Sequence, residues 1–91
     1  MHSLLQNEKE CYITHSTLDL HKHHIFMGPF RNKSEKYGCW VWLRADWHNM
    51  SNYGVHFNQP LDQYLKKEAQ KAFEDKYSHE EFMKIFRKNY L

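Results

Sequence analysis

The last third of the chain carries two consecutive helical patterns, which constrain its fold more than any other feature. After Pro60, apolar residues recur at helical spacing, with lysines and glutamates on the other faces. These apolar positions are Leu61, Tyr64, Leu65, Ala69, Ala72 and Phe73. The segment from Ser78 to Glu81 matches a capping box that opens a last helix, whose apolar stripe is Phe82, Ile85, Phe86 and Tyr90. The sequence therefore predicts two C-terminal helices that pack on the preceding residues.

The first half of the chain instead combines short apolar runs with turn residues, a pattern typical of strands. Residues 11–14 and 20–26 are predicted to pair as a hairpin across a turn at residues 16–19. The dipeptide Gly28-Pro29 should end the second strand of this hairpin.

A further strand and a short helix are expected next. The polar stretch from Arg31 to Gly38 is predicted to be an ordered loop, followed by an apolar strand over residues 39–43. A short helix should begin at Ala45 or Asp46 and stop at residues 52–54. Together these elements predict an α+β fold class.

The length of 91 residues fits a single domain with a thin core. Hydrophobic residues make up 41% of the sequence, including six Phe, six Tyr and three Trp, which is too many for a disordered tail. No apolar run reaches the roughly 20 residues that cross a bilayer, and the first residues lack the apolar region of a signal peptide. We therefore expect no membrane partner, and we expect Cys11 and Cys39 to be reduced thiols.

Six of the eight histidines fall within 42 residues: His15, His21, His23, His24, His48 and His56. Neutral imidazole is a common transition-metal ligand and a good base near neutral pH. One such histidine would be an ordinary surface or core residue, but this clustering indicates a metal site. His23 and His24 lie near the end of a predicted strand, and His48 follows 24 residues later on a predicted short helix.

This arrangement resembles the HNH endonucleases, small phage and bacterial enzymes with a ββα-metal fold. In that family, a strand provides a pair of histidines and the following helix returns a metal ligand. Cys11 and the predicted hairpin are also similar to the knuckle that often precedes the motif. The resemblance covers residues 11–56, and residues 60–91 form a helical extension within one domain spanning residues 1–91. It implies a bacterial or phage-infected cytoplasm as the location.

The resemblance also implies roles for individual residues. His24 would be the catalytic general base, His23 a metal ligand and His48 the ligand on the helix. The remaining ligand is open between Asn52, one helical turn later, and His56. One divalent ion, Mg²⁺, Mn²⁺, Ni²⁺ or Zn²⁺, would be the cofactor, and the activity would be hydrolysis of DNA phosphodiester bonds.

A local excess of basic residues surrounds the paired histidines. Between residues 22 and 44, five basic residues accompany a single acid, Glu35. The expected contacts to the DNA backbone are Lys22, Arg31, Lys33, Lys36 and Arg44. The two C-terminal helices could also support a homodimer, although no residue requires one. His21 alternates with His23 along the strand and could support the site or lie exposed.

Two other interpretations of the sequence stay open. The middle Asn of the HNH motif has no counterpart at the expected distance, which suits an HNH-like module that binds DNA or inhibits a host defence protein without catalysis. Alternatively, Cys11, Cys39, His23 and His48 could form a structural zinc site. Loss of the fold on chelation would identify such a structural site.

Overall fold

A computed structural model describes residues 2–91 and shows an α+β fold with one two-stranded antiparallel sheet. The strands are β1 (Leu20–His24) and β2 (Trp40–Arg44), separated by the 3₁₀ turn η1 (Gly28–Phe30) and helix α1 (Arg31–Tyr37). After β2 come α2 (Ala45–His48), the 3₁₀ turn η2 (Val55–Phe57), α3 (Gln59–Lys76) and α4 (His79–Phe86). The α+β class predicted from the sequence is confirmed.

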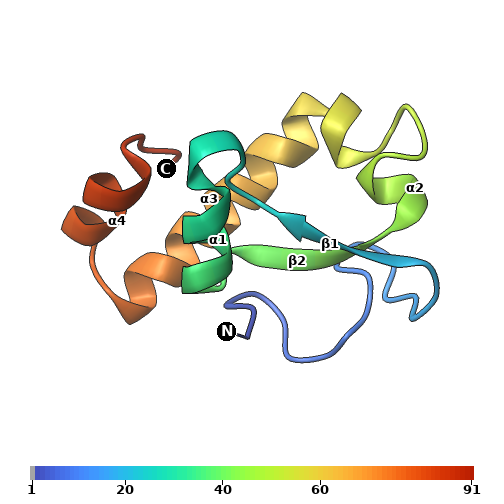
Figure 1. The fold of residues 1–91 in the computed structure, drawn as a ribbon, viewed down its shortest axis with the longest axis horizontal. Helices are drawn as coiled ribbons and strands as arrows, with labels where there is room; N and C mark the ends of the chain where they lie inside the picture. Colours follow the sequence, from blue (N-terminus) through green and yellow to red (C-terminus); the bar gives the residue numbers. More distant parts are fainter. Residues whose placement is uncertain (1) are drawn as a thin grey trace.

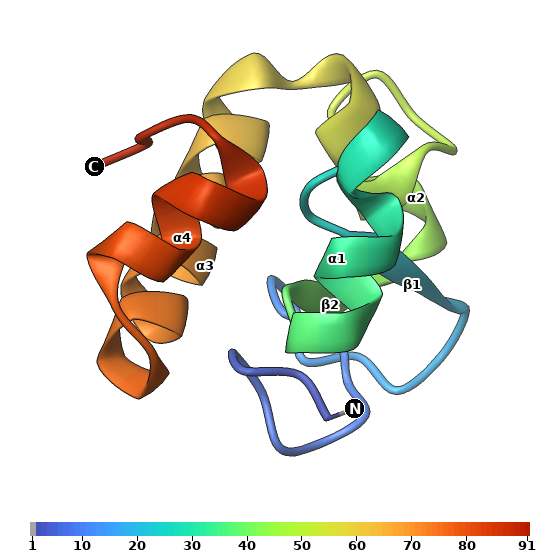
Figure 2. The same cartoon turned by 60° about the vertical axis from the view of Figure 1, so that its left-hand side comes forward.

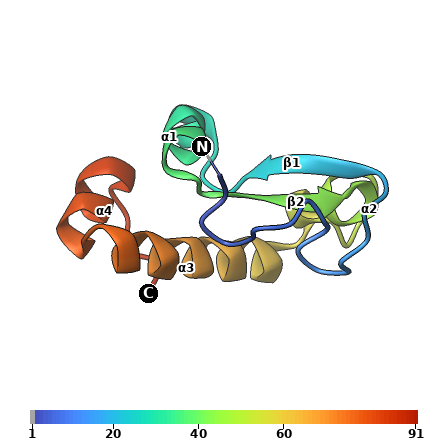
Figure 3. The same cartoon turned by 90° about the horizontal axis from the view of Figure 1, so that it is seen from below.

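The elements lie along a molecule of 36 × 25 × 20 Å, with α4 at one end and α2 at the other (Figure 1). The long helix α3 runs along one side of the sheet, and α1 lies on the opposite side (Figure 3). Helix α4 folds back beside α3 (Figure 2). One face of the sheet is therefore covered by α3 and the other by α1.

Strand alternation distributes the side chains of β1 between these two faces. The register pairs His23 with Val41 and His24 with Trp40. His21 and His23 share the face that meets α2, where both rings contact His48. Lys22 and His24 share the opposite face and bind Glu35 of α1.

The hairpin predicted over residues 11–26 is wrong, because β1 pairs with β2 and residues 11–14 form a turn. The N–H of His15 donates to the carbonyl of Cys11 at 2.8 Å, which closes that turn. His15 and Asp19 both have positive φ, 64° and 53°, so the backbone cannot run as a strand there. The predicted second strand is also shorter than expected, since β1 ends at His24.

The ordered loop predicted from Arg31 to Gly38 is largely helix, because α1 occupies residues 31–37. The sequence does not predict this helix because Ser34 is its one buried residue, so it has no apolar residues at helical spacing. Gly38 ends the helix at φ 75°, and an added Cβ would overlap with the carbonyl oxygen of His2. A glycine is therefore required at this position both for backbone conformation and for space.

The predictions of the strand over residues 39–43, seen as β2, and of the two C-terminal helices are confirmed. The predicted short helix is present as α2, but it ends at His48, before residues 52–54. Pro60 lies in the first turn of α3, where Asn58 caps the helix, and Ser78 accepts a hydrogen bond from the N–H of Glu81 at 3.1 Å. Phe73, Phe82 and Phe86 are buried in the core, Ile85 is half-buried and Tyr90 lies beyond the end of α4. Cys11 and Cys39 are buried free thiols. Among residues 2–91, no helix has the length and apolar character needed to span a membrane.

Ser34 fastens α1 to the chain that leaves β1. Its hydroxyl donates to the carbonyl of Phe26 at 2.8 Å and accepts from the N–H of Phe26 at 2.9 Å. The Ser34 side chain is fully buried, so water cannot replace these bonds. This single hydroxyl satisfies both backbone groups of one residue.

We predict that Ser34→Ala lowers the free energy of unfolding by about 2 kcal/mol, because two buried backbone groups lose their partner while helix propensity improves slightly. Urea unfolding followed by circular dichroism measures this loss. Thr17→Ala, at an exposed residue, is the control and should change stability by less than about 0.5 kcal/mol. Equal stability of the two variants would contradict the bracing role of Ser34.

Candidate metal centre

Three histidines from three different elements converge on one face of the sheet. His23 of β1, His48 of α2 and His56 of η2 each offer one ring nitrogen, and these nitrogens lie within 4.8 Å of one another. The Nε2 atoms of His48 and His56 are 3.0 Å apart. Ligand nitrogens about 2.1 Å from a tetrahedral zinc ion lie roughly 3.4 Å apart, so small side-chain shifts suffice to bind such an ion.

His23 is the most constrained of the three. It is 1% exposed, and neither of its ring nitrogens has a hydrogen-bond partner. Leaving such a buried polar group unpaired costs about 1–3 kcal/mol. Its ring centroid lies 5.3 Å from those of both His48 and His56. A cation bound between the rings would give the buried nitrogen of His23 a partner.

Close packing at Gly54 brings η2 beside α2. A Cβ at this position would lie 2.8 Å from the carbonyl oxygen of His48 and 3.0 Å from that of Asp46. Only a residue without a side chain permits this approach. Gly54 therefore allows His56, two residues later, to meet His48.

A hydrogen-bond network around Asp46 secures the same loop. Arg44 donates two hydrogen bonds to the Asp46 carboxylate, at 2.7 and 2.8 Å, and the Tyr53 hydroxyl donates a third at 2.8 Å. The bonds from Arg44 hold the pKa of Asp46 far below its usual range. The loop from α2 to η2 is thus fixed at both its start and its end.

His21 contacts the metal centre from the same face of β1. Its Nδ1 lies 3.0 Å from Nδ1 of His48, while Nε2 of His48 faces His56. A hydrogen bond between the two Nδ1 atoms fixes the ring of His48 and leaves its Nε2 facing His56, where it could bind a metal ion. Such outer partners commonly orient metal-binding histidines.

His24 lies on the other face of the sheet, away from this cluster. Its Nε2 is 3.1 Å from the Glu35 carboxylate, and Arg31 donates to its Nδ1 at 3.5 Å. Lys22 also binds Glu35, at 3.2 Å. The hydrogen bond to His24 lowers the pKa of Glu35. Sequence reasoning missed Glu35 as the partner of His24, although it is the single acid in that stretch.

The structure brings His56 to His23 and His48. Asn52 is exposed in the loop after α2. Three of the expected DNA contacts have partners within the protein: Lys22 pairs with Glu35, Arg44 with Asp46, and Arg31 contacts His24. Lys33 and Lys36 are exposed on α1.

The two cysteines lie apart from the histidine cluster. Both are fully buried in the hydrophobic core, and neither belongs to the metal-binding group found among residues 2–91. Burial raises the pKa of the Cys39 thiol to about 12, which disfavours the thiolate form that binds zinc. The geometry therefore favours a centre made of histidines alone.

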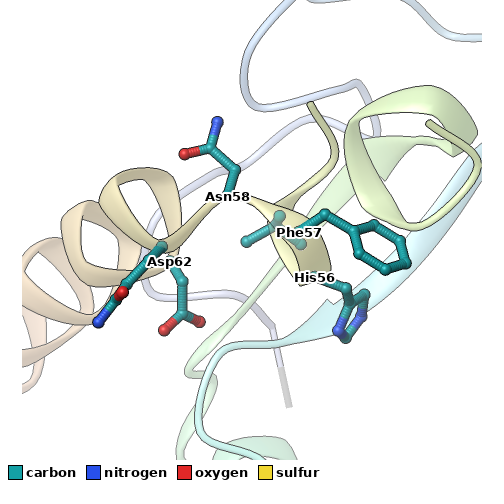
Figure 4. A pocket seen from close by; sticks show the side chains of 6 residues that line it. His56, Phe57, Asn58 and Asp62 are labelled. Atoms are coloured by element: carbon teal, nitrogen blue, oxygen red, sulfur yellow. The ribbon is translucent and has the colours of Figure 1, made fainter. Parts of the chain in front are cut away.

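An open hollow of about 460 Å³ adjoins His56. The ring of His56 and the carboxylate of Asp62 project to one side of the chain that runs from η2 into α3, and Asn58 projects to the other (Figure 4). Asp62 is paired with Lys66 at 2.8 Å. Since His56 is exposed, a substrate could approach the centre from this side.

Burial keeps two of the ligands neutral. It lowers the pKa of His23 from 6.5 to about 3 and that of His48 to about 4, and the neighbouring histidines add to both shifts. Neutral imidazole is the form that binds metal, so both rings are available to an ion at neutral pH.

We predict that the chelator-treated protein loses stability as pH falls from 6.5 toward 3. In this range the unfolded chain binds protons at His23 and His48 while the folded chain excludes them, so acid favours unfolding. The loss should be on the order of a few kcal/mol. Thermal melts at pH 7 and pH 4.5 measure it, and His23→Leu should show a smaller difference. An equal difference in His23→Leu would contradict this assignment.

We also predict that His21→Ala weakens zinc affinity by roughly 10- to 100-fold, because the ring of His48 loses its orienting partner. Competition with a chromophoric chelator measures the affinity. His15→Asn, at an exposed histidine with left-handed backbone, is the matched control and should bind zinc as the wild type does. Wild-type affinity in His21→Ala would show that His21 does not position the ligand.

Comparison with protein-family models, curated proteins and solved structures found no match to this chain. The site is therefore interpreted from its own geometry. That geometry is a cluster of three histidines, close enough to hold a metal ion, of which His23 is buried and His56 is exposed.

Proposed function

We propose that the chain is a metal-dependent endonuclease that hydrolyses DNA phosphodiester bonds in the manner of the HNH enzymes. The observation that carries the proposal is the meeting of His23, His48 and His56 around a buried, unpartnered imidazole. The order of elements supports it, because two antiparallel strands precede a short helix that bears a ligand. This is the order in the ββα-metal motif that the sequence resembles.

The chemistry of the ligands also suits a phosphodiester. Three neutral imidazoles leave the positive charge of a divalent ion uncompensated, which favours an anionic substrate. When bound, the ion would polarise a phosphate oxygen and lower the pKa of a coordinated water. His23, His48 and His56 would hold it, and the exposed side near His56 would admit the DNA backbone.

The proposed role of His24 as general base depends on Nδ1 of its ring, because Glu35 occupies Nε2. Arg31 contacts Nδ1 at 3.5 Å, the longest hydrogen bond in this group. A phosphate could draw Arg31 away and free Nδ1 to accept a proton. Since His23 and His24 leave β1 on opposite faces, the substrate would have to lie across the end of the strand.

A binding module without catalysis is the second candidate. The observation that favours it is the engagement of His24 by Glu35 on the face of the sheet opposite the metal centre. In such a module, the three-histidine centre would hold the loop between α2 and η2 in place. DNA or a host defence protein would then be the partner.

We predict that the wild-type protein nicks plasmid DNA in at least one of Mg²⁺, Mn²⁺, Ni²⁺ and Zn²⁺, and that His48→Ala reduces cleavage by more than about 100-fold, since loss of an outer partner alone costs 10- to 100-fold. His24→Ala should also lose cleavage but keep zinc affinity, because His24 lies outside the metal-binding group. His15→Asn again serves as the control.

Each result distinguishes the candidates. No cleavage by the wild type with any of the four metals would overturn the nuclease and favour the binding module. Full cleavage by His24→Ala, with none by His48→Ala, would keep the metal centre but remove His24 as the base. Unfolding of the wild type on chelation would indicate a structural metal instead.

A further inference from the structure

A second concave site lies between α1 and α4, at the opposite end of the molecule from α2. The hollow measures about 610 Å³. It is lined by Lys33, Tyr37, Tyr77, Glu81, Lys84, Ile85 and Arg87. Three cations and two phenol rings therefore face a space that contains one carboxylate.

The cations of this hollow have no acidic partners. Among residues 2–91, the ion pairs within 4.0 Å involve other basic residues, and none includes Lys33, Lys84 or Arg87. All three side chains are exposed. By contrast, Lys22, Arg44 and Lys66 are neutralised by nearby carboxylates. The hollow thus keeps its positive charge available to a ligand.

The aromatic residues join α1 to the junction of α3 and α4. The rings of Tyr37 and Tyr77 meet edge to face at 5.7 Å. Two further cations lie beside them, Lys36 at 5.4 Å from the Tyr37 ring and Lys76 at 5.6 Å from the Tyr77 ring. These two lysines add positive charge near the rings that line the hollow.

Arg87 carries a second, independent signal. It ends α4 with φ 64°, a left-handed conformation in which glycine is the usual residue. A side chain with a β-carbon is strained there, yet the chain places an arginine, and this arginine lines the hollow. Local strain of this kind is common where a side chain is needed for function.

We propose that the hollow between α1 and α4 binds a phosphate of the DNA backbone, with Arg87 and Lys84 as its principal contacts and Lys33 beside them. Guanidinium and ammonium groups are the side chains that neutralise backbone phosphates. This inference rests on the proposed action on DNA. The proposal gives the protein a second DNA-binding site, separate from the three-histidine cluster.

The test is duplex binding measured by fluorescence anisotropy with EDTA present, so that cleavage does not interfere. Arg87→Gly should bind a labelled duplex roughly three- to tenfold more weakly, and the slope of log affinity against log salt should fall by about 1. Arg87→Gly should also melt no lower than the wild type, because glycine relieves the left-handed strain. Loss of affinity without loss of stability separates binding from folding.

Two matched variants complete the experiment. Arg87→Lys keeps the charge and should retain most of the affinity. Lys71→Gln removes one exposed charge from α3 outside the hollow and should leave the affinity within about twofold. If Arg87→Gly and Lys71→Gln weaken binding equally, the effect is net charge alone and the proposed site is overturned.

The outcomes also separate this inference from the nuclease proposal. Metal-dependent cleavage by the wild type, with unchanged duplex affinity in Arg87→Gly, would overturn the phosphate site alone. Weaker duplex binding in Arg87→Gly, with no cleavage by the wild type in any metal, would support the phosphate site and overturn the nuclease. A wild-type protein that binds no duplex overturns the phosphate site, while zinc affinity and hydrolysis of bis(p-nitrophenyl) phosphate still test the metal centre.

Discussion

Antiparallel pairing between β1 and β2 determines which face of the sheet each histidine of β1 occupies. The register that sets His23 opposite Val41 directs His21 and His23 toward α2, and Lys22 and His24 toward α1. A shift of one residue would exchange these two sets between the faces. The three-histidine cluster and the contacts of Lys22 and His24 with Glu35 therefore both depend on this register, although they have no side chain in common.

The candidate metal centre also depends on close packing of backbone against backbone at Gly54. Gly54 lets the chain pass against the carbonyls of Asp46 and His48, and the Asp46 network holds the intervening loop. The three ligands come from a strand, a four-residue helix and a 3₁₀ turn, none of which is stable alone. In a domain with a thin core, a bound ion would join these weak elements, so metal affinity and local stability should be coupled.

The sequence predicts the C-terminal helices well because their signals are local: Pro60 at the helix entry, the Ser78 cap and apolar residues at helical spacing. It predicts His23 and His48 as metal ligands because the histidines cluster along the chain. It leaves Asn52 and His56 as alternatives for the remaining ligand, because the approach of His56 to His48 depends on packing at Gly54. The predicted pairing of residues 20–26 with residues 11–14 is wrong because strand pairing joins segments that are distant along the chain. Helix α1 was missed because it buries only Ser34, which leaves no apolar stripe to read.

The two proposed sites would have different roles: hydrolysis at the three histidines, and binding of the DNA backbone in the hollow between α1 and α4. The hollow between α1 and α4 and the centre near α2 lie toward opposite ends of a 36 Å long axis. A backbone phosphate held by Arg87 would therefore be a second contact, apart from the one at His56, because the two sites share no residue. A small domain that holds its substrate at two such points can orient the scissile bond without surrounding the DNA, because two separated contacts fix direction as well as position.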